Sequence, residues 1–559
     1  MKLLMTKIAR SVQLTGIGFS IAMLLTACGS SVARPTVLVE QGSVLGVERD
    51  GTKQYLGVPY AAAPVGDLRW AMPQAPAHWN VRDAGQFGAA CAQEARFGLT
   101  ERSESEDCLT LNVGVPADIK PGEKLPVFFW IPGGGFVGGS SNLYRLDKLA
   151  REGRMVVVTI NYRLGVFGFM AHPAFDAASN GDLGLEDQRY ALAWVQRNIA
   201  AFGGDPSNVT VAGESAGAGS VCMHLQSPQQ VKGLFHKAVI TSGGCLQPIP
   251  TVTYSLQGAP GSSPTWKKIA SEVGCDTTDT AGSAASLACL RKTSVADLLK
   301  AQGKAAGSDI MAFSPSIGNA TVPQSAQQAT NTGEMVRVPV LMGGATNELR
   351  LYVAYTMLYP PNITNFDVAT LKAAWLPSFY PGMESKYDAI IQQYGAQSGF
   401  DGAKFGSMVS DSTPVVGINN CLYLKTADAI KPWMPALYQY EFSDPNAPVL
   451  GVGIAKGMDP KMDLGAVHSS QLNYLFPNLS NTKAIDAPDL APASQTLSNQ
   501  MVALWSSFVH TGVPAPAGLV GMPAWPTYAG GKTVMQLRPG AVELIDAAER
   551  HQCSFWKNL

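Results

Sequence analysis

The residues Asn208-Val-Thr-Val-Ala-Gly-Glu-Ser-Ala-Gly-Ala-Gly-Ser-Val-Cys222 begin as a short apolar run and continue as small residues that can start a helix. Between the two lies Gly213-Glu-Ser-Ala-Gly217. This order of strand, sharp turn and helix is typical of a nucleophile elbow, where glycines flank a serine because a Cβ there would collide with a neighbouring strand or helix. We therefore predict that Ser215 is a nucleophile. The N–H group of Ala216, at the start of the helix, would face an oxyanion formed beside it.

Similar apolar runs occur on both sides of this stretch, as expected for parallel strands that are buried on both faces. These runs are Pro126–Ile131, Arg154–Ile160, Lys237–Thr241 and Val338–Met342. Helix-like segments alternate with them, among them Leu185–Ala201. The alternation predicts an open α/β sheet with helices on both faces. Ligands bind beyond the carboxyl ends of the strands in such a sheet, which is where Ser215 would lie.

The rest of the chain predicts one catalytic domain over residues 35–559, because no repeat, charge block or low-complexity linker divides it. Residues 251–330 and 355–432 are helix-like, and they are too long for simple crossovers. We expect them to form a cap over the strand ends. With 41 basic and 42 acidic residues, the chain has no electrostatic footprint for nucleic acid.

The N-terminal residues 1–27 have the pattern of a secretory signal. They end in Leu25-Thr-Ala-Cys28, which resembles a bacterial lipoprotein cleavage box and predicts that Cys28 is lipidated. Residues 28–34 would form a short linker, and Gly29 favours the outer membrane over the inner one. The alternative is ordinary cleavage near Ala27 and a periplasmic or secreted protein. No later stretch has the ~18 apolar residues of a membrane span, so a lipid anchor would be the only membrane contact.

The glycine-rich segment Trp130-Ile-Pro-Gly-Gly-Gly-Phe136 follows an apolar strand and can bring backbone N–H groups close to a substrate oxygen. Glu348 follows another strand, within Gly343-Gly-Ala-Thr-Asn-Glu348, and so places a carboxylate just past a strand end. An ordinary surface glutamate is the alternative reading of Glu348. We predict that it is the acid that orients a catalytic base, because a serine nucleophile needs a base and the base needs a carboxylate.

The base should come late in the chain, because the α/β-hydrolase order is serine, acid, histidine. Three histidines qualify by position, His468, His510 and His551. His510 ends an apolar helical run, where a histidine more often matches the helix dipole, and His551 lies near the terminus. His468 lies in a loop between a glycine and a new apolar segment. We favour His468.

Several motifs resemble the type-B carboxylesterases, the family that includes cholinesterases and bacterial para-nitrobenzyl esterases. These motifs are Tyr55-Leu-Gly-Val-Pro-Tyr-Ala-Ala-Ala-Pro-Val-Gly-Asp-Leu-Arg-Trp70, Glu106-Asp-Cys-Leu-Thr-Leu-Asn-Val113, Asn161-Tyr-Arg-Leu-Gly165, Phe202-Gly-Gly-Asp-Pro206 and Gly465-Ala-Val-His468. The resemblance implies an α/β-hydrolase fold, a central, mostly parallel sheet with helices on both faces and a helical cap. It also implies particular roles: Ser215 as nucleophile, Glu348 as acid, His468 as base, and the N–H groups of Gly134, Gly135 and Ala216 as oxyanion hole.

The sequence departs from the family pattern in three places. Pro132 stands where the family usually has histidine before the glycines, and Gln471 replaces a frequent glutamate. The segment Ala92–Asp107, where cholinesterases carry the tryptophan that holds choline, has no tryptophan, and its aromatic residue is Phe97. We therefore expect a neutral ester and not a choline ester as substrate.

Cysteines other than Cys28 are even in number, which is typical of disulfides in an exported chain. We expect Cys91 to bond Cys108 across a short loop. The family resemblance further pairs Cys275 with Cys289 and Cys421 with Cys553. For Cys222 and Cys245 a bond and two buried free thiols remain equal alternatives. No cysteine or histidine spacing indicates a metal site.

The resemblance as a whole implies a serine carboxylesterase that hydrolyses small neutral carboxylic esters through an acyl-enzyme, with no cofactor. One alternative is a lipase acting on longer acyl chains, if the cap is a mobile apolar lid. The other is a non-catalytic cholinesterase-like binding protein, but such proteins typically lose the nucleophile or the base. The natural ester and the oligomeric state do not follow from the sequence.

Overall fold

The computed structural model describes residues 34–95, 100–258, 263–276, 284–307, 312–359, 362–395, 399–449, 459–477, 489–515 and 522–559. The expected signal at 1–27 and Cys28 lie outside the described residues. Pro35–Leu559 form a unit by themselves. Among the described helices, none combines the length and the apolar character needed to cross a membrane.

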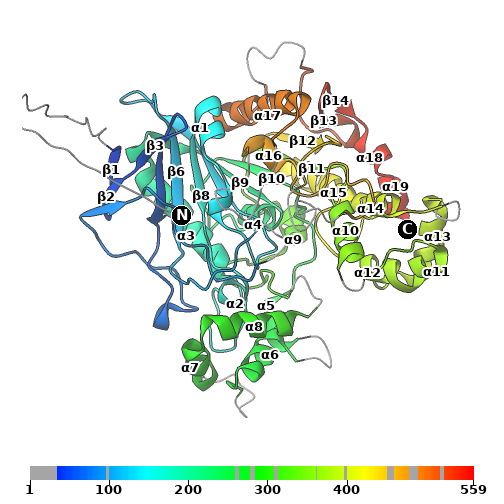
Figure 1. Cartoon of the computed structure of the whole chain (residues 1–559), viewed down its shortest axis with the longest axis horizontal. Coiled ribbons are helices and arrows are strands. Elements are labelled where there is room, and N and C mark those ends of the chain that lie inside the picture. Colours follow the sequence, from blue (N-terminus) through cyan, green and yellow to red (C-terminus); the bar gives the residue numbers. More distant parts are fainter. Residues whose placement is uncertain are drawn as a thin grey trace, which may run out of the picture. The chain divides into compact units, whose positions relative to one another are not determined.

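A large mixed sheet runs through this unit (Figure 1), and its strands follow the order β14-β13-β12-β11-β10-β9-β7-β8-β6-β4-β3. The bounds of the strands are Val47–Arg49 for β3, Thr52–Pro59 for β4, Thr110–Pro116 for β6, Leu125–Ile131 for β7, Val156–Ile160 for β8, Gly204–Glu214 for β9, Lys237–Thr241 for β10, Val340–Ala345 for β11, Leu437–Phe442 for β12, Val534–Arg538 for β13 and Ala541–Ile545 for β14. From β8 to β13 all neighbours are parallel, and antiparallel pairs occur only toward the two edges of the sheet. A smaller sheet joins β1 (Thr36–Val39), β2 (Gly42–Leu45) and β5 (Val81–Asp83).

The central strand β7 shows why the sequence folds in this way. All its residues are buried, and because side chains alternate between the faces of a strand, they divide between two hydrophobic clusters. Phe129 and its i±2 neighbours pack with residues of α3 (Leu183–Asn198) and α4 (Ala216–Leu225). Phe128 and Trp130 pack with residues of α17 (Pro492–Thr511). Helices therefore cover both faces, and the predicted α/β-hydrolase fold is confirmed.

Two parallel strands, β12 and β13, were not expected from the sequence. In Leu437-Tyr-Gln-Tyr-Glu-Phe442 and in Val534-Met-Gln-Leu-Arg538 polar residues interrupt the apolar ones, so neither segment forms a continuous apolar run. Gln439 and Glu441 are nevertheless buried. Glu441 is buried because it has ionic and hydrogen-bonding partners, which a hydrophobic pattern cannot reveal.

The two segments expected to form a cap are largely helical. The first contains α5 (Val252–Gln257), α6 (Thr265–Glu272), α7 (Ala284–Lys292), α8 (Val295–Ala306) and α9 (Ala326–Thr332). The second contains the C-terminal part of α10 (Arg350–Leu358), then α11 (Val368–Thr370), α12 (Leu376–Phe379), α13 (Tyr387–Gln393), α14 (Gly402–Asp411) and α15 (Asn420–Ile430). Figure 1 shows α6–α8 and α10–α14 as two separate groups, and the second group has a hydrophobic cluster of its own.

Disulfides join Cys91 to Cys108, Cys275 to Cys289 and Cys421 to Cys553, the pairs expected above. Cys222 and Cys245, for which two alternatives were open, are also bonded. This last bond ties α4, the helix that follows Ser215, to the segment after β10. Disulfides persist in oxidising compartments, so these bonds indicate an exported protein.

Candidate active site

Ser215 occupies a sharp turn between β9 and α4. Its backbone has φ 56° and ψ −119°, a conformation that is strained for a residue with a side chain. The flanking glycines make the turn possible: a Cβ on Gly213 would come within 2.4 Å of the backbone of Gly217, and a Cβ on Gly217 within 2.1 Å of Ile131 O. The turn therefore has the geometry of the predicted nucleophile elbow, and Ser215 lines a cavity at the strand ends.

The glycine-rich loop after β7 faces the same cavity, through Gly133, Gly134 and Gly135. Gly134 has φ 117°, and a Cβ on it would lie 2.2 Å from Gly138 O, so only glycine fits. No hydrogen bond among the described residues takes up the N–H groups of Gly134, Gly135 and Ala216. These N–H groups are available to a ligand oxygen in the cavity.

His468 and Glu348 are brought together from positions 120 residues apart. His468 Nδ1 lies 2.7 Å from Glu348 Oε2, and both side chains are buried. The backbone supports the pair, because His468 N–H donates to Glu348 O at 3.2 Å. His468 also lines the cavity that contains Ser215. Of the three late histidines, His510 instead approaches the backbone oxygen atoms of Gly153 and Arg154.

Glu214 is a second carboxylate at this histidine, and sequence reasoning did not assign it a role. Its Oε1 lies 3.2 Å from His468 Nε2 and accepts a hydrogen bond from Ser469 Oγ at 2.6 Å. Burial lowers the pKa of His468, but the charges of Glu214 and Glu348 outweigh burial and raise this pKa to about 8. Burial raises the pKa of Glu214 itself. The position of Glu214, directly before the nucleophile, was the one signal that could have indicated it.

The Glu348 carboxylate oxygen that does not face His468, Oε1, has hydrogen-bond donors of its own. Oε1 accepts hydrogen bonds from Ala345 N–H at 2.8 Å and from Tyr423 OH at 3.0 Å. The amide of Asn420 donates to the backbone oxygens of Ala345 and Thr346, in the same loop. These hydrogen bonds hold the carboxylate in the orientation that faces His468.

The cavity has a volume of about 160 Å³. Its wall is mainly apolar and aromatic, and it includes Phe136, Val137, Leu143, Tyr144, Leu351, Tyr352, Tyr355, Val416, Ile418 and Leu472. The second expected cap segment therefore contributes to the wall through Tyr355, Val416, Gly417 and Ile418. The first contributes no described residue to it.

Two departures from the family pattern have defined places in the structure. Gln471 Nε2 donates to Ser242 Oγ at 2.6 Å, so this amide fastens the turn after His468 to the segment after β10. Pro132 O accepts a hydrogen bond from Tyr162 OH at 2.9 Å, which fixes the start of the glycine loop. Phe97, the aromatic residue noted in the segment Ala92–Asp107, lies outside the described residues.

Comparisons with known proteins agree with this geometry. The chain is 31% identical over 504 residues to para-nitrobenzyl esterase of Bacillus subtilis (strain 168), covering 88% of this chain and 92% of the relative. It is 32% identical to the precursor of a medium-chain fatty acyl-CoA hydrolase of Anas platyrhynchos (90% of this chain, 88% of the relative), and 34% identical to fumonisin B1 esterase of Sphingopyxis macrogoltabida (85% and 82%).

Among solved structures, a thermophilic PNB esterase superposes with a TM-score of 0.72 at 28% identity, covering 93% of this chain and 99% of that one. Another PNB esterase structure gives a TM-score of 0.73 at the same identity and coverage. The model of the carboxylesterase family matches residues 33–556. The chain therefore belongs to the carboxylesterase family and is a carboxylic ester hydrolase.

Proposed function

We propose that this protein is a serine carboxylesterase that uses Ser215, His468 and Glu348 as a triad. The observation that carries the proposal is the placement of His468. One nitrogen of its ring is held by the buried carboxylate of Glu348, and the ring lines the cavity into which the elbow presents Ser215.

In the proposed reaction, Ser215 Oγ attacks the ester carbonyl carbon while His468 accepts the hydroxyl proton. The N–H groups of Gly134, Gly135 and Ala216 donate to the oxyanion of the tetrahedral intermediate. His468 then returns the proton to the departing alcohol, and water releases the acid from the acyl-enzyme by the same steps. Glu348 stays ionised and stabilises the imidazolium that forms twice in each turnover.

The triad residues should behave as a unit. Ser215→Ala and His468→Ala are each expected to lower kcat by several orders of magnitude, and the double variant should be little worse than either single variant. An organophosphate should label Ser215 and lose its target in Ser215→Ala. Labelling at another serine, or a Ser215→Ala variant that keeps its activity, would overturn the assignment.

We further propose that the substrate is a neutral carboxylic ester. The apolar residues of the cavity wall support this, and the near-zero net charge of the chain provides no overall field for a cation. The test compares kcat/KM for butyrylthiocholine and an uncharged thioester of matched size. A preference above about tenfold for the cation, equivalent to ~1.4 kcal/mol, would contradict the proposal, because Tyr352 and Tyr355 would then supply the aromatic faces that a quaternary ammonium needs.

We also propose that Cys28 carries the lipid of an outer-membrane lipoprotein. The Leu25-Thr-Ala-Cys28 box supports this, and several acyl chains bind a membrane far more firmly than one. Cys28→Ser should move the enzyme from the membrane fraction to the soluble fraction. An unchanged membrane-bound fraction would instead favour ordinary cleavage near Ala27.

A further inference from the structure

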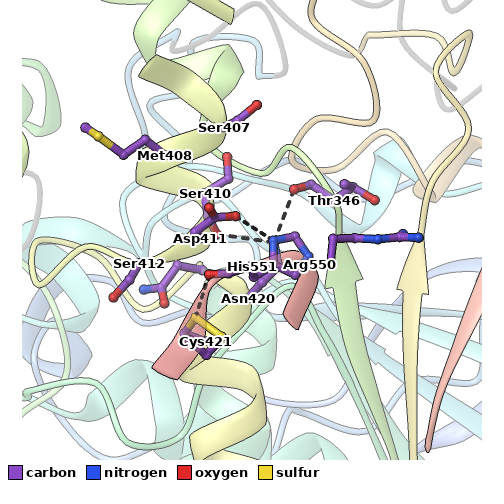
Figure 2. A network of polar contacts seen from close by, with 12 residues as sticks. Thr346, Ser407, Met408, Ser410, Asp411, Ser412, Asn420, Cys421, Arg550 and His551 are labelled. Atoms are coloured by element: carbon purple, nitrogen blue, oxygen red, sulfur yellow. Dashed lines mark hydrogen bonds and ion pairs between the residues drawn. A yellow bond between two sulfur atoms is a disulfide. The ribbon is translucent and has the colours of Figure 1, made fainter. Parts of the chain in front are cut away.

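A second histidine, His551, lies between the carboxylates of Asp411 and Glu441, and Figure 2 shows it beside Asp411. His551 Nδ1 is 2.6 Å from Asp411 Oδ1, and His551 Nε2 is 2.9 Å from Glu441 Oε2. The three side chains are 3%, 9% and 2% exposed, so water cannot replace these contacts. His551 follows α18 (Ala547–Arg550). It is not part of the cavity wall.

The contacts require that His551 be an imidazolium. Each ring nitrogen faces a carboxylate oxygen, and a neutral ring has only one N–H to donate. Arg550 Nη1 lies 2.9 Å from Glu441 Oε1, so two cations balance two anions in the cluster. Tyr394 OH donates to the other oxygen of Asp411 at 2.8 Å. The groups that face His551 are therefore fully paired, as buried charges must be.

The shifts in pKa agree with this protonation state. Burial lowers the pKa of His551, but the charge of Glu441 and the hydrogen bonds of both carboxylates outweigh burial and raise the pKa to about 9. Burial also raises the pKa of Glu441, but the charges of His551 and Arg550 bring it down to about 2.

The two carboxylates belong to the two elements that flank the loop of Glu348. On one side, Glu441 of β12 accepts a hydrogen bond at 2.8 Å from Thr346 Oγ1, two residues before Glu348. On the other side, Asp411 ends α14. The residue before it, Ser410, accepts a hydrogen bond through Oγ from the N–H of Leu349, directly after Glu348, at 2.9 Å. His551 therefore joins the two supports between which the loop is held.

The chain also fixes His551 itself. Cys421, at the start of α15, has its Sγ 3.4 Å from His551 O. Its disulfide partner Cys553 lies two residues past His551. The C-terminal segment is thus attached next to the cluster. Among the described residues, both hydrogen bonds of the His551 ring go to carboxylates and none goes to a nucleophilic side chain.

We propose that His551 is a positioning residue for catalysis, which aligns Glu348 with His468 by tying β12 to the end of α14. This inference rests on the proposed function, because it needs Glu348 to act as the acid of the triad. When the histidine is neutral or absent, Asp411 and Glu441 lose the cation between them, and the loop of Glu348 loses its fixed position. A displacement of about 1 Å at a catalytic group can lower a rate about a hundredfold.

The test uses His551→Gln, which is neutral but similar in size, in the full-length enzyme at a fixed interval below the melting temperature of each variant. We expect kcat to fall about tenfold or more, with KM within about twofold. Thr346→Val removes the link to Glu441 and should lower kcat in the same way. The kcat of the double variant should be no lower than that of His551→Gln, because both substitutions remove the same connection between His551 and the loop of Glu348.

A matched control is Glu106→Gln, which breaks another buried ion pair, with Arg69, away from the cavity. It should lower the melting temperature and leave kcat unchanged. The acid limb of the plot of kcat/KM against pH, where activity falls as His468 becomes protonated, gives an independent readout. A displaced Glu348 no longer raises the pKa of His468. The limb should move to lower pH in His551→Gln and Thr346→Val, and stay in place in Glu106→Gln.

Wild-type kcat and an unmoved acid limb in His551→Gln would overturn the inference and leave His551 a purely stabilising role. If His551→Gln does not fold, Thr346→Val alone decides by the same two measurements. A kcat of the double variant that falls by the product of the two single losses would also contradict the inference. The proposed function is tested separately: an active Ser215→Ala enzyme refutes that function, whereas an inactive Ser215→Ala together with an unaffected His551→Gln refutes only this inference.

Discussion

Glu214→Gln is expected to shift the acid limb of the kcat/KM profile to lower pH. The substitution removes the charge that lies 3.2 Å from His468 Nε2 and keeps an oxygen that can accept the hydrogen bond of Ser469. At this distance two unit charges interact by about 5 kcal/mol at an effective dielectric constant of about 20. Part of this interaction offsets the desolvation of the pair, and opposite charges at such distances shift a pKa by about 1 to 3 units.

With the pKa of His468 at about 8, only about one tenth of the enzyme has a neutral base at pH 7. A shift of about 1.5 units would make about three quarters of the enzyme competent at that pH. The ratio of kcat/KM at pH 7 to that at pH 9 should therefore rise from about 0.1 to about 0.8. This ratio does not depend on whether the substitution changes the limiting value of kcat/KM at high pH.

The assay is hydrolysis of a p-nitrophenyl ester, followed at the isosbestic wavelength of the product from about pH 5.5 to pH 9.5. Glu384→Gln is the control, since it removes an exposed carboxylate outside the cavity wall and should leave the profile unchanged. An acid limb that stays in place in Glu214→Gln, while His468 remains essential, would show that Glu214 does not set the protonation of the base.

Three further outcomes follow from the contacts. His551 has a folded-state pKa of about 9, above its unfolded value of 6.5, so the stability that its charge contributes is complete below pH 6.5 and is lost as the pH rises through 9. Urea unfolding should show that the free energy of unfolding falls by an amount on the order of 3 kcal/mol across this window. In His551→Gln this dependence on pH should disappear. Cys222→Ala with Cys245→Ala opens a loop of 23 residues and should lower the free energy of unfolding by about 3 kcal/mol; an unchanged urea midpoint would contradict this. Tyr423→Phe removes a donor to Glu348 Oε1 and should lower kcat about tenfold relative to wild type. KM should stay unchanged, and steady-state kinetics of the two enzymes measure both constants.

Much of the candidate site is encoded locally, which is why sequence reasoning reached it. The elbow of Ser215 and the loop of Gly134 need glycines at fixed spacing after apolar strands, and both patterns are readable without a fold. The position of Glu348 past a buried strand is a signal of the same kind. By contrast, β12 was missed because Gln439 and Glu441 interrupt its apolar pattern, and their burial depends on partners elsewhere in the chain.

Local pattern thus determined the parallel strands β7 to β11, the strained turn at Ser215 and the candidate residues of the triad, because backbone sterics and the periodicity of burial act over a few residues. Tertiary structure decided which distant groups meet. It placed His468 against Glu348 across 120 residues, bonded Cys222 to Cys245 and enclosed His551 between Asp411 and Glu441. Such contacts depend on distance and desolvation between elements that only the folded chain brings together, and charges that would be weakly coupled in water become strongly coupled when buried.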